Sequence, residues 1–188
     1  MRQEKKKSEE LEVLEIVTGR LNKEDIPYIV SGSIALNYYT IPRMTRDIDI
    51  VIELDYMAIN KFVNLFQSDF YIDPEMIERE VFRQGMFNLI HNQYVIKIDF
   101  IIRKKTKFQD LIFLRKKNVT IGDSKIWLIS AEDLILAKLL WAKDSHSDIQ
   151  LKDIKNLFTT VPQLEEEYIV HWVSQLGLEE IYKLVNNG

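Results

Sequence analysis

Cysteine is absent from the 188 residues, and only 6 glycines and 4 prolines are present. Without cysteine, the protein can form neither a disulfide framework nor a thiolate metal site, and such a composition fits a reducing compartment. No linker rich in glycine, proline or serine divides the sequence, and no internal repeat is visible. A chain of this length suits one domain with a sizeable core.

A long apolar run is missing too. No stretch reaches the roughly 18 apolar residues that a membrane-spanning helix needs. The first ten residues are charged and have no apolar region of the signal-peptide kind. We therefore expect a soluble, cytoplasmic protein with no membrane partner.

The chain has no overall excess of positive charge. Its net charge of −4 argues against a general nucleic-acid coat. The segment 97–117 is nevertheless basic, because eight basic side chains minus two acidic ones give a local charge of +6. The basic residues are Lys97, Arg103, Lys104, Lys105, Lys107, Arg115, Lys116 and Lys117. This segment is either a solvated surface or a binding site for RNA or tRNA.

Hydrophobic periodicity predicts strands in the middle of the chain and helices at both ends. The predicted strands cover residues 28–31, 47–53, 87–91, 94–102 and 125–128. The predicted helices cover residues 8–22, 33–39, 56–66 and the segment from 131 onward. This order indicates an α+β (mixed α/β) fold. We expect an α/β core over 1–130 and a C-terminal helical part over 131–188, packed together as one unit.

Two aspartates alternate with isoleucine on the strand 47–53. Asp47 and Asp49 therefore project from the same face, where their charges repel unless a cation lies between them. Asp99 lies on the polar face of the strand 94–102 and would join them if the two strands are neighbours. Three such carboxylates suit two Mg²⁺ (or Mn²⁺) ions and in-line displacement at phosphorus. The alternative for an isolated Asp-x-Asp is a solvated strand face.

Gly32 and Ser33 occupy the point where a predicted strand passes into a helix. Glycine lets a phosphate approach the backbone, and the helix N-terminus offers unpaired N–H groups. The spacing is not that of a P-loop. An ordinary strand–helix turn with a serine cap is the alternative.

Together these residues resemble the nucleotidyltransferase superfamily: Gly32-Ser33, thirteen intervening residues, Asp47-Ile48-Asp49, and then Asp99 on a later strand. The runs 31–36 and 42–49 look like the minimal branch that contains the AbiEii-type toxin proteins, and the resemblance covers roughly residues 10–155. It implies a nucleotidyltransferase-like sheet, a nucleoside triphosphate such as ATP as substrate, and metal binding by the first two acids. Asp99 would complete the catalytic and metal site.

The run 130–138, followed by Lys152-Asp153-Ile154, is similar to the AbiEii-type helix with its lysine and later Arg-Asp pair. The resemblance implies that Lys138 contacts the triphosphate, whereas the alternative is a surface lysine that covers apolar neighbours with its stem. Lys152 stands where the family often has arginine and cannot form its bidentate contacts. Arg43 and Arg46 flank the acidic strand, and each either contacts phosphate or pairs with Asp47.

Two further groups of residues have structural interpretations. Ser130 is expected to cap the next helix, with Asp133 in the capping-box position. The three tryptophans, Trp127, Trp141 and Trp172, are expected to pack the core.

The sequence thus predicts an enzyme that transfers a nucleoside monophosphate from an NTP to a hydroxyl and releases pyrophosphate. Gly32 and Ser33 would hold the outgoing phosphates, and Asp99 with one metal would activate the hydroxyl. Three acceptors stay open: an RNA end, a protein side chain, or a small molecule such as an antibiotic. The rival hypothesis is a catalytically idle module that acts as an antitoxin or scaffold, with a toxin–antitoxin partner.

Overall fold

The protein is built on one mixed sheet of seven strands, in the order β3-β4-β5-β2-β1-β7-β6. The computed structural model describes residues 7–45, 47–145 and 147–186. The strands are β1 (Tyr28–Val30), β2 (Asp47–Ile52), β3 (Phe70–Tyr71), β4 (Met86–His91), β5 (Lys97–Ile102), β6 (Lys117–Ile121) and β7 (Ser124–Leu128). β2 pairs with β5, and β1 with β7, in parallel, and the other pairs are antiparallel. The predicted α+β (mixed α/β) class is confirmed.

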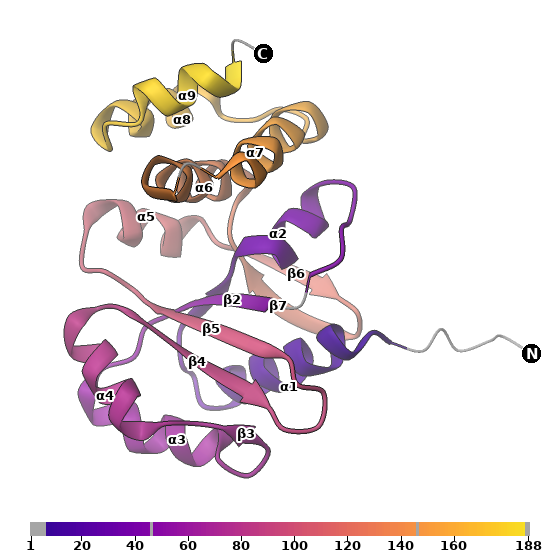
Figure 1. Ribbon diagram of the computed structural model, residues 1–188, viewed down its shortest axis with the longest axis vertical. Helices are drawn as coiled ribbons and strands as arrows, with labels where there is room; N and C mark the ends of the chain where they lie inside the picture. The colour runs from indigo at the N-terminus through magenta and orange to yellow at the C-terminus, as the bar shows by residue number, and fades with distance from the viewer. Residues whose placement is uncertain (1–6, 46, 146, 187–188) are drawn as a thin grey trace, which may run out of the picture.

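Helices lie on the sheet and extend beyond it (Figure 1). They are α1 (Glu9–Lys23), α2 (Gly32–Tyr39), the 3₁₀ helix η1 (Tyr56–Ala58), α3 (Ile59–Phe66), α4 (Pro74–Arg83), α5 (Lys107–Arg115), α6 (Ala131–Ser145), α7 (Asp148–Thr160), α8 (Glu166–Gln175) and α9 (Glu179–Asn186). In Figure 1, α3 and α4 lie at one end, and α6 and α7 separate α2 from α8 and α9 at the other. No helix among the described residues combines the length and apolarity needed to span a bilayer.

The core follows from the alternation in the two central strands. Ile48, Ile50 and Ile52 of β2 are fully buried, and Ile98 and Phe100 of β5 are buried beside them. Burying a large apolar side chain contributes about 1.5–3 kcal/mol before the entropy of ordering it is counted. The opposite faces of these strands are therefore left to carry the polar residues.

Four elements were not predicted from the sequence: β3, α4, α5 and β6. β6 is an edge strand that pairs only with β7, and none of its residues is buried. Hydrophobic alternation is a poor guide to such a strand, because little of it faces the core. The segment of α5 was assigned to the basic surface, although Thr106 caps this helix by accepting from the Gln109 N–H at 3.3 Å.

Candidate active site

The strand register brings two of the predicted acids together. β2 and β5 run parallel with Asp49 opposite Asp99 and Asp47 opposite Lys97. Directly paired residues of neighbouring strands project from the same face, so the acids share one face of the sheet. Burial and the neighbouring charge of Asp99 raise the pKa of Asp49, while a hydrogen bond that the carboxylate accepts from the Ser33 N–H and the charge of Lys138 act in the opposite direction.

A cation from the protein itself lies among the acids. The Lys97 Nζ is 2.7 Å from Asp99 Oδ2 and 3.8 Å from Asp47 Oδ1. The hydrogen bond to Asp99 raises the pKa of Lys97. Lys97 was not among the site residues predicted from the sequence. Its i, i+2 spacing to Asp99 was the signal, because it places both side chains on one face of β5.

The three acids suit a divalent cation in chemistry, but the described side chains are not arranged as a closed metal site. Carboxylate oxygens are the ligands that Mg²⁺ prefers, and two of the three acids already share one cation, the Lys97 ammonium. Among the described residues, no group of three His, Cys, Asp or Glu is placed to hold a metal ion. A bound metal would therefore need Lys97 to move away.

Gly32 provides a close approach between the first helix turn and the acids. Its φ of +57° lies in the left-handed region, and a Cβ at this position would be 1.8 Å from Asp49 Oδ2. The Ser31 N–H donates to the Asp49 carbonyl oxygen at 2.9 Å and fixes the turn against β2. Only glycine fits here, so the N-terminus of α2 lies directly against the Asp49 carboxylate.

Lys138 is a buried residue of α6, with 5% of its surface exposed, so it is not the surface lysine of the alternative interpretation. Its Nζ donates to Asp153 Oδ2 at 2.8 Å and to Gln150 Oε1 at 2.9 Å, both on α7. Arg43 donates to the same Asp153 oxygen at 3.2 Å and to the Ser33 hydroxyl at 3.1 Å. Asp153 thus links Lys138 to Arg43, and Arg43 in turn contacts the start of α2. Asp153 was not predicted as a site residue from the sequence.

Some of these groups line one cavity of about 190 Å³. Gly32, Asp49 and Lys138 line it, together with Gln150 and Trp141. The structure therefore brings the glycine turn, an acid and a buried cation to one place. Arg46, the remaining predicted nucleotide-binding residue, lies outside the described residues.

No protein-family model matches the chain, and no curated protein matches it in sequence. Solved structures do match. A nucleotidyltransferase-like antigenic protein from Paracoccidioides brasiliensis is 20% identical with a TM-score of 0.58, over 82% of this chain and 77% of that one. The lincosamide adenylyltransferase LnuA, with lincomycin bound, is 16% identical with a TM-score of 0.53, over 82% and 98%.

A third match is ANT(2″)-Ia in complex with adenylyl-2″-tobramycin, 10% identical with a TM-score of 0.56, over 93% of this chain and 99% of that one. From these matches, the 188-residue chain has a nucleotidyltransferase-like fold. Identities this low show the fold alone, so the AbiEii-type branch stays a prediction, as do the roles of the site residues.

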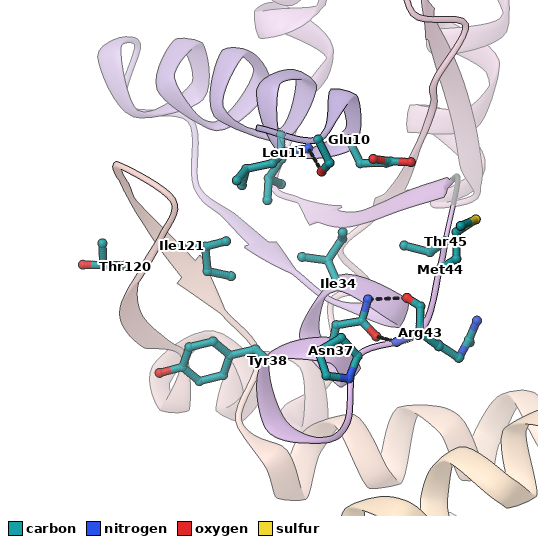
Figure 2. A pocket seen from close by; sticks show the side chains of 13 residues that line it. Glu10, Leu11, Ile34, Asn37, Tyr38, Arg43, Met44, Thr45, Thr120 and Ile121 are labelled. Carbon is teal, nitrogen blue, oxygen red and sulfur yellow. Dashed lines mark hydrogen bonds between the residues drawn. The ribbon is translucent and has the colours of Figure 1, made fainter. Parts of the chain in front are cut away.

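A second cavity, of about 740 Å³, opens beside the loop that leads into β2 (Figure 2). Leu11 of α1, Ile34 and Tyr38 of α2 and Ile121 of β6 line it. The Asn37 amide fixes the loop, because it donates to the Arg43 carbonyl oxygen at 2.7 Å and accepts from the Arg43 N–H at 2.9 Å. The volume of this second cavity lies in the range of small-molecule sites, about 300–1,000 Å³.

The basic segment 97–117 is partly neutralised by ion pairs within the nucleotidyltransferase fold. Arg103 pairs with Glu53 and, at 2.6 Å, with Asp110. Arg115 pairs with Glu165 at 2.9 Å, and Lys97 belongs to the acidic site. Lys104, Lys105 and Lys107 are exposed on the surface.

The structural interpretations have mixed outcomes. Ser130 caps α6 as expected, since its hydroxyl accepts from the Asp133 N–H at 3.1 Å and donates to Asp133 Oδ2 at 2.8 Å. Trp127 and Trp172 pack, partly buried, against the core. The expectation for Trp141 was wrong, because 56% of its surface is exposed.

Proposed function

We propose that the protein transfers a nucleoside monophosphate from a nucleoside triphosphate to a hydroxyl acceptor and releases pyrophosphate. The observation that carries this proposal is the register of β2 and β5, which sets Asp49 beside Asp99 on one face. Asp49 also lies against Gly32 and lines one cavity with Lys138. An anion-binding turn, paired acids and a buried cation are what phosphoryl chemistry requires of a protein.

Each predicted site residue has a role in the proposed reaction. The N–H of Gly32 and the hydroxyl of Ser33, with Lys138 and Arg46, bind and orient the phosphates. Asp99 accepts the proton of the attacking hydroxyl, whose oxygen bonds to the α-phosphorus while the bond to the β-phosphate oxygen breaks. Asp47, Asp49 and Asp99 would hold two Mg²⁺ or Mn²⁺ ions, and a bound metal would neutralise charge on the triphosphate.

We propose a small molecule as the acceptor. Two proteins of similar fold are a lincosamide adenylyltransferase with lincomycin bound and a complex with adenylyl-2″-tobramycin. The 740 Å³ cavity next to the β2 loop has the size for such an acceptor. An RNA or protein acceptor, and a toxin–antitoxin partner, are the rivals. If RNA is the acceptor, alanine at Lys104, Lys105 and Lys107 should weaken its binding and reduce its salt dependence.

One observation favours a second candidate, a module that binds a nucleotide without catalysing its transfer. The Lys97 ammonium already occupies the space between Asp47 and Asp99. A protein that never binds metal could keep its acids balanced in this way. The two candidates differ in whether Mg²⁺ displaces Lys97.

The test is incubation with each α-labelled NTP and Mg²⁺, offered with small-molecule, RNA and protein acceptor pools. The proposal expects label to appear on an acceptor, and expects Mg²⁺ with NTP to raise the melting temperature by mass action. Asp47→Asn with Asp49→Asn should stay folded and lose both signals. The matched control is Glu75→Gln with Glu78→Gln, which removes two exposed charges from the distant α4.

Binding of NTP that does not depend on Mg²⁺, without labelling of any pool, would favour the idle module. Melting temperatures that do not respond to Mg²⁺ and NTP would refute both candidates.

A further inference from the structure

Trp141 is an exposed aromatic residue on a helix that is buried over most of its length. Nine residues of α6 are buried, and they include the charged Glu132, Asp133 and Lys138. Trp141 nevertheless leaves 56% of its surface exposed. A helix that buries charges while exposing its largest apolar side chain is unusual, since exposed aromatic surface commonly marks a binding site.

The exposed indole belongs to the same cavity as the phosphate-binding groups. Leu134, Ala137, Lys138 and Trp141 follow the spacing i, i+3, i+4, i+7, which places them on one face of α6. All four line the 190 Å³ cavity that Gly32 also lines. Trp141 lies about 4.5 Å beyond Lys138 along the helix axis, and the short side chain of Ala137 adds little bulk to this wall.

We propose that Trp141 stacks on the base of the bound nucleoside triphosphate, and that the site therefore prefers purines. The inference rests on the proposed function, because it takes the triphosphate to lie at Gly32 and Lys138. The base is then the part of the ligand that extends along the cavity wall. Any base can stack on an indole, and the larger purine ring overlaps it more, so stacking strength gives the preference.

Binding assays separate the base from the phosphates. ATP, CTP and inorganic tripolyphosphate are titrated with Mg²⁺ into the wild type, Trp141→Ala and Trp141→Phe. Trp141→Ala should weaken ATP binding on the order of tenfold and leave tripolyphosphate binding unchanged, whereas Trp141→Phe should retain most of the affinity. Phe82→Ala, which removes an aromatic side chain that is 89% exposed on α4, is the matched control and should change neither.

Tryptophan fluorescence gives an independent measurement. Stacking on ATP should quench the emission that the wild type has and Trp141→Phe lacks, while tripolyphosphate should leave it unchanged. Trp127 and Trp172 remain in both proteins and serve as the internal reference.

The outcomes distinguish this inference from the proposed function. If neither ATP nor tripolyphosphate binds the wild type, the proposed function fails, and the inference fails with it. If ATP binds the wild type and Trp141→Ala equally well, the stacking role is refuted while the function stands. An equal loss for ATP and tripolyphosphate would also refute it, because Trp141 would then act on the phosphate site. A change in oligomeric state in Trp141→Ala without a change in ATP affinity would assign the exposed face to a second copy instead.

Discussion

Replacing Gly32 by alanine tests the geometry on which the site depends. The added Cβ would lie 1.8 Å from Asp49 Oδ2, 2.5 Å from its Cγ and 2.8 Å from its Cβ. The end of a side chain can rotate away, but the Cβ of Asp49 is fixed by the backbone of β2. The whole carboxylate must therefore shift, or α2 must move off the sheet.

Two terms set the expected magnitude. Alanine in the left-handed region costs about 1–2 kcal/mol, and forced overpacking adds about 1–3 kcal/mol. Gly32→Ala should thus lower the free energy of unfolding by roughly 2–5 kcal/mol, measured by urea denaturation. Because the clash displaces Asp49, the stabilisation by Mg²⁺ and NTP should also disappear.

Gly177 offers a control that isolates the backbone term. Its φ is +63°, close to that of Gly32, and within the described part of the chain a Cβ there would come within 4 Å of Lys143 Nζ alone, at 3.7 Å. Gly177→Ala should cost only the backbone term of about 1–2 kcal/mol. Asp49→Ala should reduce the cost of Gly32→Ala towards this value, because it removes the two closest atoms. If Gly32→Ala costs no more than Gly177→Ala, the Asp49 carboxylate does not lie on the glycine turn, and the reasoning is wrong.

Three further predictions concern the charges of the site. Burial raises the pKa of Asp49, so between the unfolded-state and folded-state pKa values the folded protein binds more protons than the unfolded chain. The contribution of Asp49 to stability therefore falls as pH rises through its folded-state pKa. Asp49→Asn should therefore be more stable than the wild type at neutral pH without metal, and the difference should shrink in acid denaturation series. Lys97→Met should tighten Mg²⁺ binding by about fivefold, the equivalent of the roughly 1 kcal/mol of a part-exposed ion pair, and unchanged calorimetric affinity would show that Lys97 does not compete. Asp153→Asn should lower the free energy of unfolding, measured by urea denaturation, by about 3–5 kcal/mol, because it leaves the buried Lys138 charge uncompensated. Adding Lys138→Met should recover most of this loss.

Local periodicity accounts for the part of the fold that the sequence predicts. The strand predicted at 47–53 is β2 (Asp47–Ile52), and the helix predicted at 8–22 is α1 (Glu9–Lys23). Both have a buried face that repeats with a fixed period over most of their length. The missed helix α4 also had a readable signal, since Asp73 caps it by accepting from the Met76 N–H at 3.1 Å and Pro74 follows.

The site is harder to predict because it depends on strand order and register. Nothing local in the sequence says that β2 and β5 are parallel neighbours, or that Asp49 lies opposite Asp99 rather than two residues away. The Asp-x-Asp spacing gave the face of each strand but not the pairing. Trp141 shows the same limit, because its exposure depends on how α6 lies against α2, α7 and α8. An apolar helical pattern by itself predicts a buried helix.

The charges of the site are paired in a way that bears on how a nucleotide would enter. Lys97 balances Asp47 and Asp99, and Asp153 balances Lys138 and Arg43. A bare triphosphate would approach acids, and a bare metal ion would have to displace an ammonium. A metal–triphosphate complex would bring both charges at once: the acids would hold the metal in place of Lys97, and Lys138 and Arg43 would pair with the phosphates. Each ligand then lowers the electrostatic cost of the other, and by linkage the effect is reciprocal. The arrangement therefore favours cooperative entry of metal and nucleotide over stepwise binding of either one.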